Sequence, residues 1–497
     1  MSPWETENYV ALYYAMTTDN ILTAGLARID ITPPLGFRMQ GAMRRVEGAE
    51  GIETNLFATA LVLADNDNKI VILDCDLLGF DPPLAAEIRT KIGDKVGIAG
   101  TNVLLGATHT HNGPCTSRGN CGGSHDIPVR EGEIEELDTY IENLVRQLVG
   151  LAALADSDRQ PVRIGAGSDE ANVAINREEI GVEDGEVLVG RNPDGVTDRS
   201  VDVLRIDDLE GNPVAVIVAY AAHPVVMGYF QYLYSQDYPG VVRRIVEGAT
   251  GATCLFLTGA AGNQACWSFL QSDWGEQERM GGRIGGAALN AFYQIETRPH
   301  EEIRERGMSL SLIALYRKKF HDGPTHEVFR TASGVARVKL QPLPSLEEAE
   351  AQLATARAQL QEYEDAGEST VKTVPQRLEV RWAEGILAKV KAGELENTLE
   401  YAIAGYRIDD FVLLSMPGEP FVEIQLGAKE RSKARHTMFA GYANGIVGYI
   451  PVAKTIQRGG MSVSSALRTY NIPAAPTESA VDDVVDAFGA VLEELGL

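Results

Sequence analysis

Two closely spaced histidines, His109 and His111, are the residues of this chain best suited to chemistry. They lie in residues 107–114, which read Ala-Thr-His-Thr-His-Asn-Gly-Pro and follow an apolar run at residues 102–105. Because side chains two residues apart in a strand point the same way, both imidazoles are expected to reach one spot before the Asn-Gly-Pro turn. The pair indicates either a metal or catalytic site, or a packed, hydrogen-bonded pair without a ligand.

Three further residues occupy similar positions after apolar stretches. His223 stands in Ala-Ala-His-Pro, so three of the eight histidines follow apolar runs beside Pro or Gly. Glu419 lies in Met-Pro-Gly-Glu-Pro, a rigid turn that suits a metal ligand, although a single loop glutamate is ordinarily solvent-exposed. Tyr449 follows another turn, where a packed tyrosine with a satisfied hydroxyl is the alternative.

The elements that must position these residues are buried strands and the helices between them. Nearly continuous Val, Ile, Leu and Phe content is typical of sheets that are covered on both faces, and it predicts strands at residues 70–74, 102–107, 215–221, 254–258, 411–415 and 437–440. Helical spacing predicts helices at residues 83–92, 137–154 and 241–247. Together they predict an α/β fold, a layered mixed sheet flanked by helices, with ligands beyond the strand ends.

Residues 345–393 have a different composition, rich in Ala, Glu, Gln and Leu. The pattern predicts a long helix, a break at residues 367–375 and a second helix at 379–391, which together form a helical hairpin inserted into the fold. We expect it to pack on the domain without a catalytic role. No convincing linker divides the chain, so residues 1–497 are expected to form a single catalytic domain.

Composition excludes several classes of partner. The chain has 497 residues, with 44 Lys and Arg against 70 Asp and Glu, and its net charge of −26 argues against nucleic acid or an anionic membrane surface. It contains no apolar run of about 18 residues, as a membrane-spanning helix requires. Its first residues lack the order of a secretory signal. A cytoplasmic protein without a membrane-spanning segment is therefore expected.

The five cysteines form an odd and scattered set, which favours reduced thiols over a disulfide framework. They are Cys75, Cys115, Cys121, Cys254 and Cys266. Cys115 and Cys121 flank a Gly-rich loop, so they could pair or bind metal, or simply belong to a surface loop. Their spacing matches no standard zinc motif.

Two other segments have more than one interpretation. The Gly-rich residues 258–263 follow a strand but lack the Lys-Ser/Thr ending of a P-loop, so close packing against the metal site explains the glycines better than phosphate binding does. Asp237 could be an acid that orients a metal ligand, or an acid at the start of a helix.

Seven short motifs, in this order, resemble those of the neutral/alkaline, non-lysosomal ceramidase family. The resemblance spans residues 24–468, and such an ordered set is far more specific than any single motif. The motifs are Ala-Thr-His-Thr-His-x-Gly-Pro, Asn176-Arg177, Asn192-Pro193-Asp194-Gly195, Val203-Leu204-Arg205, Ala-Ala-His-Pro, Pro-Gly-Glu-Pro-Phe and Gly-Tyr-x-Pro.

The resemblance implies a zinc-dependent amidohydrolase that cleaves carbon–nitrogen bonds other than peptide bonds. The zinc ligands would be His109, His223, Glu419 and Tyr449, a set that leaves a position for water. His111 would move protons to and from the metal-activated water, and Arg177 would point toward the substrate and, with Tyr449, stabilise the developing charge. The substrate would be an N-acylated small molecule or a lipid-like amide.

Two departures from the family pattern bear on the substrate. Ala265 stands where the family has a serine, and Met461 stands where it often has a second tyrosine. Metal binding is expected to survive both changes, whereas recognition of a sphingoid head group is not; Asn263 and Met461 are still expected near the substrate. We therefore expect a divergent homologue without the C-terminal β-rich domain of true ceramidases.

Two alternatives to an amidase remain open. An esterase or lactonase would use the same metal site, because the same activated water attacks both kinds of carbonyl. A binding module that keeps the fold without turnover is the other alternative, since fold alone does not fix function. The acidic composition favours soluble amides over substrates in anionic bilayers, and the oligomeric state is open.

Overall fold

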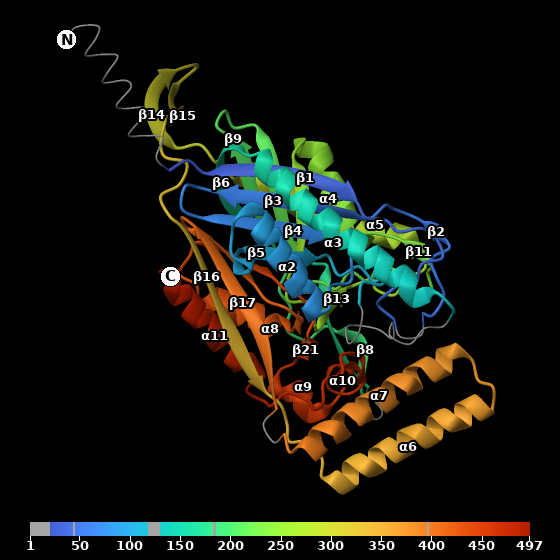
Figure 1. Cartoon of the computed structure of the whole chain (residues 1–497). Coiled ribbons are helices and arrows are strands. Elements are labelled where there is room, and N and C mark those ends of the chain that lie inside the picture. The colour runs from blue at the N-terminus through green and yellow to red at the C-terminus, as the bar shows by residue number, and fades with distance from the viewer. Residues whose placement is uncertain (1–19, 43–44, 118–129, 182–184, 395–396) are drawn as a thin grey trace.

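The computed structural model describes residues 20–42, 45–117, 130–181, 185–394 and 397–497. Its core is an eight-stranded mixed sheet in the order β12-β10-β9-β6-β1-β3-β4-β5 (Figure 1). The β4–β5 and β10–β12 pairs are parallel and the others are antiparallel. In chain order the strands are β1 (Thr23–Asp30), β3 (Phe57–Ala64), β4 (Lys69–Cys75), β5 (Val103–Ala107), β6 (Gln160–Glu170), β9 (Ser200–Asp208), β10 (Pro213–Tyr220) and β12 (Thr253–Thr258).

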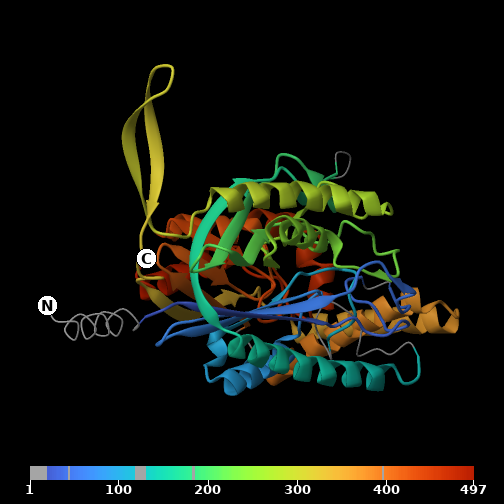
Figure 2. The same cartoon turned by 90° about the horizontal axis from the view of Figure 1, so that it is seen from above.

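The eight-stranded sheet is bent into two halves. Strands β1 and β6 join the halves over only two register pairs, and the two edge strands, β5 and β12, contact each other. Helices cover the outside of each half, as the layers in Figure 2 show. Helices α2 (Pro82–Val96) and α3 (Glu133–Ser157) pack on the half that contains β3 to β5, and α4 (Asp237–Thr250) and α5 (Trp274–Gln294) pack on the other half.

A second sheet of four strands packs against the inner face of the first. Its order is β16-β17-β18-β20, and β18 and β20 are parallel. Leu104 and Leu257 of the large sheet share one apolar cluster with Leu413 and Met438 of the small sheet. The small sheet consists of β16 (Phe329–Lys339), β17 (Thr398–Ile408), β18 (Phe411–Ser415) and β20 (His436–Ala440), and its other face is covered by α8 (Val422–Arg431) and α11 (Ala480–Glu494).

This architecture confirms the predicted α/β fold with a layered mixed sheet and flanking helices. All six predicted strands occur, in β4, β5, β10, β12, β18 and β20, and the three predicted helices lie within α2, α3 and α4. The strand prediction succeeded because these strands are buried on both faces, so each contains almost no polar position.

The predicted helical hairpin connects β16 to β17 and consists of α6 (Leu346–Asp365) and α7 (Thr370–Ala392). It packs on the domain through α7, where the indole nitrogen of Trp382 donates a hydrogen bond of 2.6 Å to the carbonyl of Ile472. The predicted break at residues 367–375 is too long, because α7 begins at Thr370 and includes Pro375. Pro375 has no backbone N–H, so the helix loses the hydrogen bond to the carbonyl of Val371. Because Val371 is exposed, water can bind that carbonyl instead.

Shorter elements complete the structure. The two-stranded and three-stranded sheets are formed by β2 (Gly51–Ile52) with β11 (Leu233–Tyr234), by β13 (Gln264–Cys266) with β7 (Ala174–Ile180) and β8 (Val187–Asn192), by β14 (His300–Met308) with β15 (Leu312–Phe320), and by β19 (Glu419–Pro420) with β21 (Tyr449–Ile450). The short helices are η1 (Gly100–Asn102), α9 (Ala453–Arg458), η2 (Met461–Val463) and α10 (Ser465–Thr469).

Two further predictions concern membrane-spanning helices and the state of the cysteines. Among the described residues, every helix is too short or too polar to cross a bilayer. Cys75, Cys115, Cys254 and Cys266 are buried free thiols. Cys121 lies outside the described residues, so the question of a pairing with Cys115 stays open.

Candidate metal centre

The predicted site residues follow strands whose carboxyl ends lie together. His109 follows β5, His223 follows β10, Glu419 follows β18 and Tyr449 follows β20. Because β5 and β12 contact each other and β20 contacts β12 and β10, the loops after these strands meet at one end of the two packed sheets. The site therefore combines residues that are 340 positions apart in the sequence.

His109 and His111 lie in the turn after β5, not on the strand itself. The backbone of His109 has a positive φ of 65°, which is uncommon for a residue with a side chain. Neighbouring groups hold it there, since its amide donates to the carbonyl of Leu77 at 2.9 Å and Thr258 Oγ1 donates to the carbonyl of Thr108 at 2.7 Å. The two rings lie 5.0 Å apart, so the pairing inferred from strand periodicity is produced by a turn.

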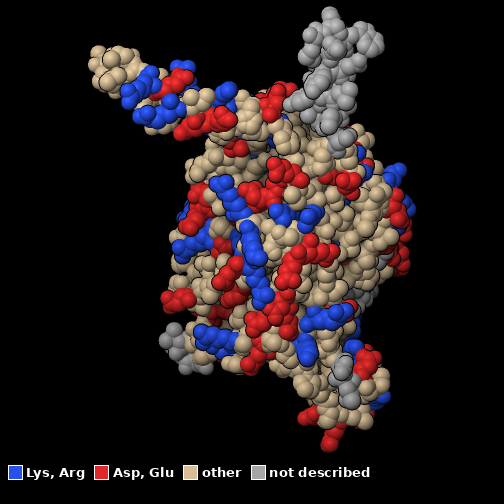
Figure 3. Space-filling view, turned by 90° about the vertical axis from the view of Figure 1, so that its left-hand side faces the viewer, with Lys and Arg blue, Asp and Glu red and all other residues tan. Residues whose placement is uncertain are grey.

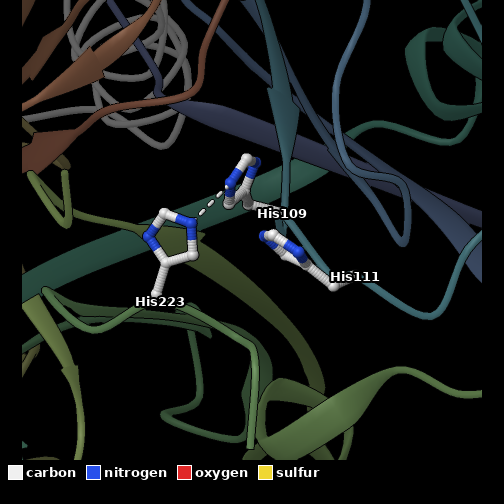
Figure 4. A group of neighbouring side chains, drawn as sticks. All are labelled: His109, His111 and His223. Atoms are coloured by element: carbon white, nitrogen blue, oxygen red, sulfur yellow. Dashed lines mark hydrogen bonds between the residues drawn. The ribbon is translucent and has the colours of Figure 1, made fainter. Parts of the chain in front are cut away.

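The imidazoles of His109, His111 and His223 converge (Figure 4). Each offers a ring nitrogen, and the three nitrogens lie within 4.8 Å of one another. His109 Nε2 and His223 Nε2 are 2.9 Å apart. Glu419 Oε2 lies 3.5 Å from the first of these nitrogens and 3.4 Å from the second.

Hydrogen bonds fix the tautomer of all three histidines. The Nδ1 atoms of His109, His111 and His223 lie 2.7, 2.9 and 3.0 Å from the backbone carbonyls of Leu78, Gly41 and Ala261. A carbonyl only accepts, so each Nδ1 carries the proton and each neutral ring presents a bare Nε2 lone pair. Two lone pairs 2.9 Å apart, facing a carboxylate oxygen, repel one another unless a cation lies between them. The side chains present therefore fit a metal ion.

Glu419 is the carboxylate of this cluster. It is buried, and its Oε2 has no hydrogen-bond partner among the described residues. Its Oε1 accepts a hydrogen bond from the hydroxyl of Tyr470. Strands β19 and β21 pair in parallel with Glu419 opposite Tyr449, which brings the fourth predicted ligand beside the third. An unsatisfied buried carboxylate oxygen is costly without a cation.

Arg177 lies on the same wall of the site. Its Nη2 donates to the Tyr449 hydroxyl at 3.1 Å and to the carbonyl of Gly262 at 2.8 Å. Burial alone would lower the pKa of Arg177, but Tyr449 and Glu419 raise it above the usual value. The guanidinium is therefore a fixed positive charge held beside the phenol.

Burial also shifts the other ionisable groups of the site. Burial, together with nearby Arg177 and His109, lowers the pKa of His111 and that of His223 well below the usual histidine value. Burial raises the pKa of Glu419, but His109 and Arg177 outweigh it and hold that pKa below normal. Neutral imidazoles and an ionised carboxylate are the protonation states that metal ligation requires.

Three other residues singled out from the sequence lie behind the cavity and do not line it. Asp237 accepts hydrogen bonds from the amides of Met227 and Tyr238 at the start of α4, and burial raises its pKa to about 6. Asn263 Oδ1 accepts from the amide of Val422 at 2.9 Å. Ala265 is buried and forms an isolated bridge with His223. Their described contacts hold loops and helix ends in place.

Met461 does line the cavity, and its position near a substrate stays a prediction. The cavity has a volume of about 200 Å³ and also contains the three histidines, Glu419, Arg177 and Tyr449. Helix α10 forms one wall, and Ser465 on this helix also lines a second cavity of about 660 Å³ between α10 and α7 of the helical hairpin.

Two tyrosines of the site were missed in the sequence. Tyr442 follows β20, its ring lies 4.1 Å from that of His109, and its hydroxyl lies 3.3 Å from His223 Nδ1. Its place directly after a buried strand is the same signal that His109 and His223 gave. Tyr470, which binds Glu419, follows the short helix α10 and carries no local signal. Tyr470 supplies a hydroxyl group to the cavity. Met461, which also lines the cavity, stands where the family pattern often has a second tyrosine.

The Gly-rich loop at residues 258–263 packs against the site, as its composition suggested. A Cβ atom on Gly262 would lie 2.4 Å from the carbonyl oxygen of Glu419 and 2.9 Å from that of Pro420. A Cβ atom on Gly259 would lie 2.6 Å from the Gln425 side chain. The glycines thus permit the close approach of this loop to the segment that carries Glu419.

Substitution Gly262→Ala should therefore destabilise the protein. The added methyl must displace the backbone of Glu419, which we expect to cost about 1–3 kcal/mol of unfolding free energy. Gly282→Ala is the matched control, because Gly282 lies in α5 with no atom within 4 Å of the new methyl, and the change should stabilise the helix by about 1 kcal/mol. Equal unfolding free energies in the two variants, measured by urea denaturation, would contradict the packing argument.

Comparison with known proteins agrees with this architecture. Residues 22–276 match the family described as neutral/alkaline non-lysosomal ceramidase, N-terminal. The chain is 27% identical over 269 residues to neutral ceramidase A of Dictyostelium discoideum, a match that covers 51% of this chain and 35% of that protein. It is 24% identical over 463 residues to the neutral ceramidase of Pseudomonas aeruginosa, covering 86% of this chain and 66% of that protein.

The crystal structure of neutral ceramidase from Pseudomonas aeruginosa has the same fold. It superposes with a TM-score of 0.62 at 19% identity, over 96% of this chain and 75% of that chain. The matched region spans between about a third and two thirds of the length of the curated relatives. Because the family model covers half of its residues, and the fold agrees throughout, this chain belongs to the neutral/alkaline non-lysosomal ceramidase family.

Proposed function

We propose that this protein is a zinc-dependent hydrolase that cleaves the amide bond of an N-acylated small molecule or lipid-like substrate. One observation carries the proposal: the bare Nε2 atoms of His109 and His223, 2.9 Å apart, face an unpartnered carboxylate oxygen of Glu419. Membership of a family whose relatives are called neutral ceramidases supports amide hydrolysis as the reaction class.

Zinc suits the donors better than the other common ions do. Zn²⁺ accepts imidazole nitrogens and carboxylate oxygens in sites with few ligands, whereas Mg²⁺ and Ca²⁺ prefer oxygen donors alone. We assign His109, His223, Glu419 and Tyr449 as ligands. A bound zinc ion would polarise the substrate carbonyl and acidify a water molecule.

His111 is suited to proton transfer. Its Nδ1 is engaged by the carbonyl of Gly41, while its Nε2 has no partner among the described residues and points into the cluster. A neutral imidazole in this position can accept a proton at Nε2. Because burial lowers its pKa, the ring then passes the proton on readily to the leaving amine.

Arg177 and Tyr449 are suited to stabilise the developing negative charge on the carbonyl oxygen. The guanidinium donates to the phenol, so the two donors are held together on one wall of the cavity. Burial, and then Glu419, raises the pKa of Tyr449 well above the normal tyrosine value. The phenol would therefore keep its proton and could donate to the carbonyl oxygen while a lone pair of its oxygen serves as the metal ligand. Donors of this kind contribute about 3 kcal/mol each in other hydrolases.

The volumes of the two cavities favour a substrate that extends beyond its amide group. About 200 Å³ at the metal centre accommodates the amide and a few neighbouring atoms. The adjoining cavity of about 660 Å³, lined by Val371, Pro375 and Leu378 of α7 and by Arg468 of α10, has room for an acyl chain or for the amine part.

The test is a substrate panel with the metal content controlled. We expect about one zinc per chain, faster hydrolysis of N-acyl amides than of matched esters, loss of activity with a chelator and recovery with zinc. Consistently faster ester cleavage would replace the amidase assignment by an esterase or lactonase. Stoichiometric zinc without turnover of any N-acyl compound would instead support a binding module.

A further inference from the structure

A β-ribbon formed by β14 and β15 stands away from the body of the protein (Figures 1 and 2). Its strands pair with each other, and neither pairs with another described strand. At its base, the Arg298 guanidinium lies 3.8 Å from the centre of the Phe320 ring, and Lys318 pairs with Glu296 at 3.1 Å. A lone two-stranded hairpin is only marginally stable in water, so we expect its distal part to be covered by something else.

The end of the ribbon is apolar and exposed. Residues 307–316 contain no charged side chain and read Gly-Met-Ser-Leu-Ser-Leu-Ile-Ala-Leu-Tyr. Their relative exposures include 72% for Met308, 104% for Leu310, 74% for Leu312 and 60% for Tyr316. A group of this size, in which the large side chains are apolar and all but the half-buried Leu315 are exposed, marks a binding surface.

The apolar side chains lie on both faces of the ribbon end. Met308 and Leu312 are cross-strand partners on one face, and the next pair, Gly307 and Ile313, belongs to the opposite face because side chains alternate along a strand. A protein partner usually covers one face of a sheet and leaves the other to water. The acyl chains of a lipid layer surround an inserted tip on both sides, so this distribution favours lipid.

Basic residues follow directly behind the apolar tip, and Figure 3 shows the tan tip with blue Lys and Arg residues behind it. Arg306 comes first, and Arg304 and then Arg317, whose register partner is Ile303, lie progressively further from the tip. Glu305, the single acidic residue among them, pairs with Arg317 at 3.6 Å. Arg306 is four residues from Leu310 at the turn, which at about 3.3 Å per residue places it roughly 13 Å behind the tip. Interfacial segments enter the boundary between head groups and acyl chains by about 5–10 Å, so Arg306 would lie close to the lipid phosphates.

The acidity of the whole chain does not oppose this contact. Strands β14 and β15 hold five Lys and Arg against three Glu, whereas the full chain has a net charge of −26. Nine residues per strand give the ribbon a length of about 30 Å. That exceeds the Debye length of about 8 Å at physiological salt, so the charge of the body is screened at the tip.

We propose that the β14–β15 ribbon binds the surface of a phospholipid bilayer, with Leu310 and Leu312 inserted and Arg306 at the lipid phosphates. This contact is separate from the metal centre, and it anchors the protein without a membrane-spanning helix. The bilayer also covers the apolar end of the ribbon, which is otherwise exposed to water.

The test is co-sedimentation of the full-length protein with vesicles of phosphatidylcholine and phosphatidylglycerol. The wild type should bind, and the double variant Leu310→Ser, Leu312→Ser should bind at least about tenfold more weakly, because it loses the inserted apolar groups. Arg306→Gln should weaken binding about fivefold, and more at low salt than at high salt. Leu154→Ser, at an exposed leucine of α3, is the matched control and should bind like the wild type.

Three results would overturn the proposal. The first is a wild type that stays in the supernatant with both lipids. The second is equal binding by the double variant and the wild type. The third is a self-association, seen by analytical ultracentrifugation, that the double variant abolishes while neither protein binds vesicles, which would make the ribbon an interface between copies of this chain.

Discussion

The variant His223→Ala should lose its metal and nearly all of its activity. His223 Nε2 lies 2.9 Å from His109 Nε2 and 3.4 Å from Glu419 Oε2, so its removal leaves the proposed cation with one imidazole ligand fewer. A catalytic cation supplies several kcal/mol of transition-state stabilisation, and each 1.36 kcal/mol is a factor of ten in rate. We therefore expect turnover to fall by roughly a thousandfold or more, and zinc content, measured by mass spectrometry, to approach zero.

Two controls separate loss of the site from loss of the fold. His321→Ala makes the same change at an exposed histidine and should keep both zinc and activity. Added imidazole can enter the space left by the missing ring, and it should restore part of the activity of His223→Ala without changing its circular dichroism. Retention of stoichiometric zinc and normal turnover by His223→Ala would refute the proposed ligand set.

The variant Arg243→Met should show the largest loss of stability. Arg243 in α4 is buried, and it binds Asp74 Oδ2 at 2.8 Å and also Asp76. Asp74 Oδ2 in turn accepts from the amide of Phe256 at 2.9 Å, so this ion pair ties β4 to β12 where the edges of the bent sheet meet. Breaking a buried pair by removing one partner costs about 3–5 kcal/mol.

The stability that Arg243→Met loses should increase with pH. Burial raises the pKa of Asp74 to about 6, although Arg243 lowers it. Without Arg243 this folded-state pKa rises further above the unfolded value, so ionisation favours the unfolded chain increasingly as the pH rises. The difference in unfolding free energy between variant and wild type should therefore be larger at pH 8 than at pH 5.

Urea denaturation at the two pH values measures this effect. Arg244→Met is a close control, because the neighbouring Arg244 is exposed and pairs with Glu278 at the surface, where ion pairs contribute about 0–1 kcal/mol. Equal destabilisation by the two variants, or a loss that is greater at pH 5, would show that the buried pair does not have this role.

The sequence predicted the buried part of the fold and missed the exposed part. Strands such as β4 and β12 are covered on both faces, so their apolar runs identify them. Strand β14 has the sequence His-Glu-Glu-Ile-Arg-Glu-Arg-Gly-Met and is solvent-exposed. Its sequence therefore lacks the apolar run that identifies a buried strand. Pro375 misled the helix prediction because a helix near the surface tolerates one lost hydrogen bond.

The site was predictable where its residues follow buried strands. His109, His223 and Glu419 come together as predicted, because the loops after β5, β10 and β18 meet at one end of the two packed sheets. Asp237 could not be assigned from the sequence, and its described contacts are with amides at a helix start. Tyr470 was missed because only the tertiary packing of α10 brings its hydroxyl to Glu419.

The division of the metal centre between two sheets has a consequence for biosynthesis. The three histidines lie before residue 224, whereas Glu419 and Tyr449 follow almost 200 residues later. At about 5–20 residues per second, the ribosome needs some 10–40 s to bridge that interval. During this time the nascent chain holds bare imidazole nitrogens without their carboxylate, so the proposed zinc ion would be captured tightly only once the small sheet has been translated and has docked.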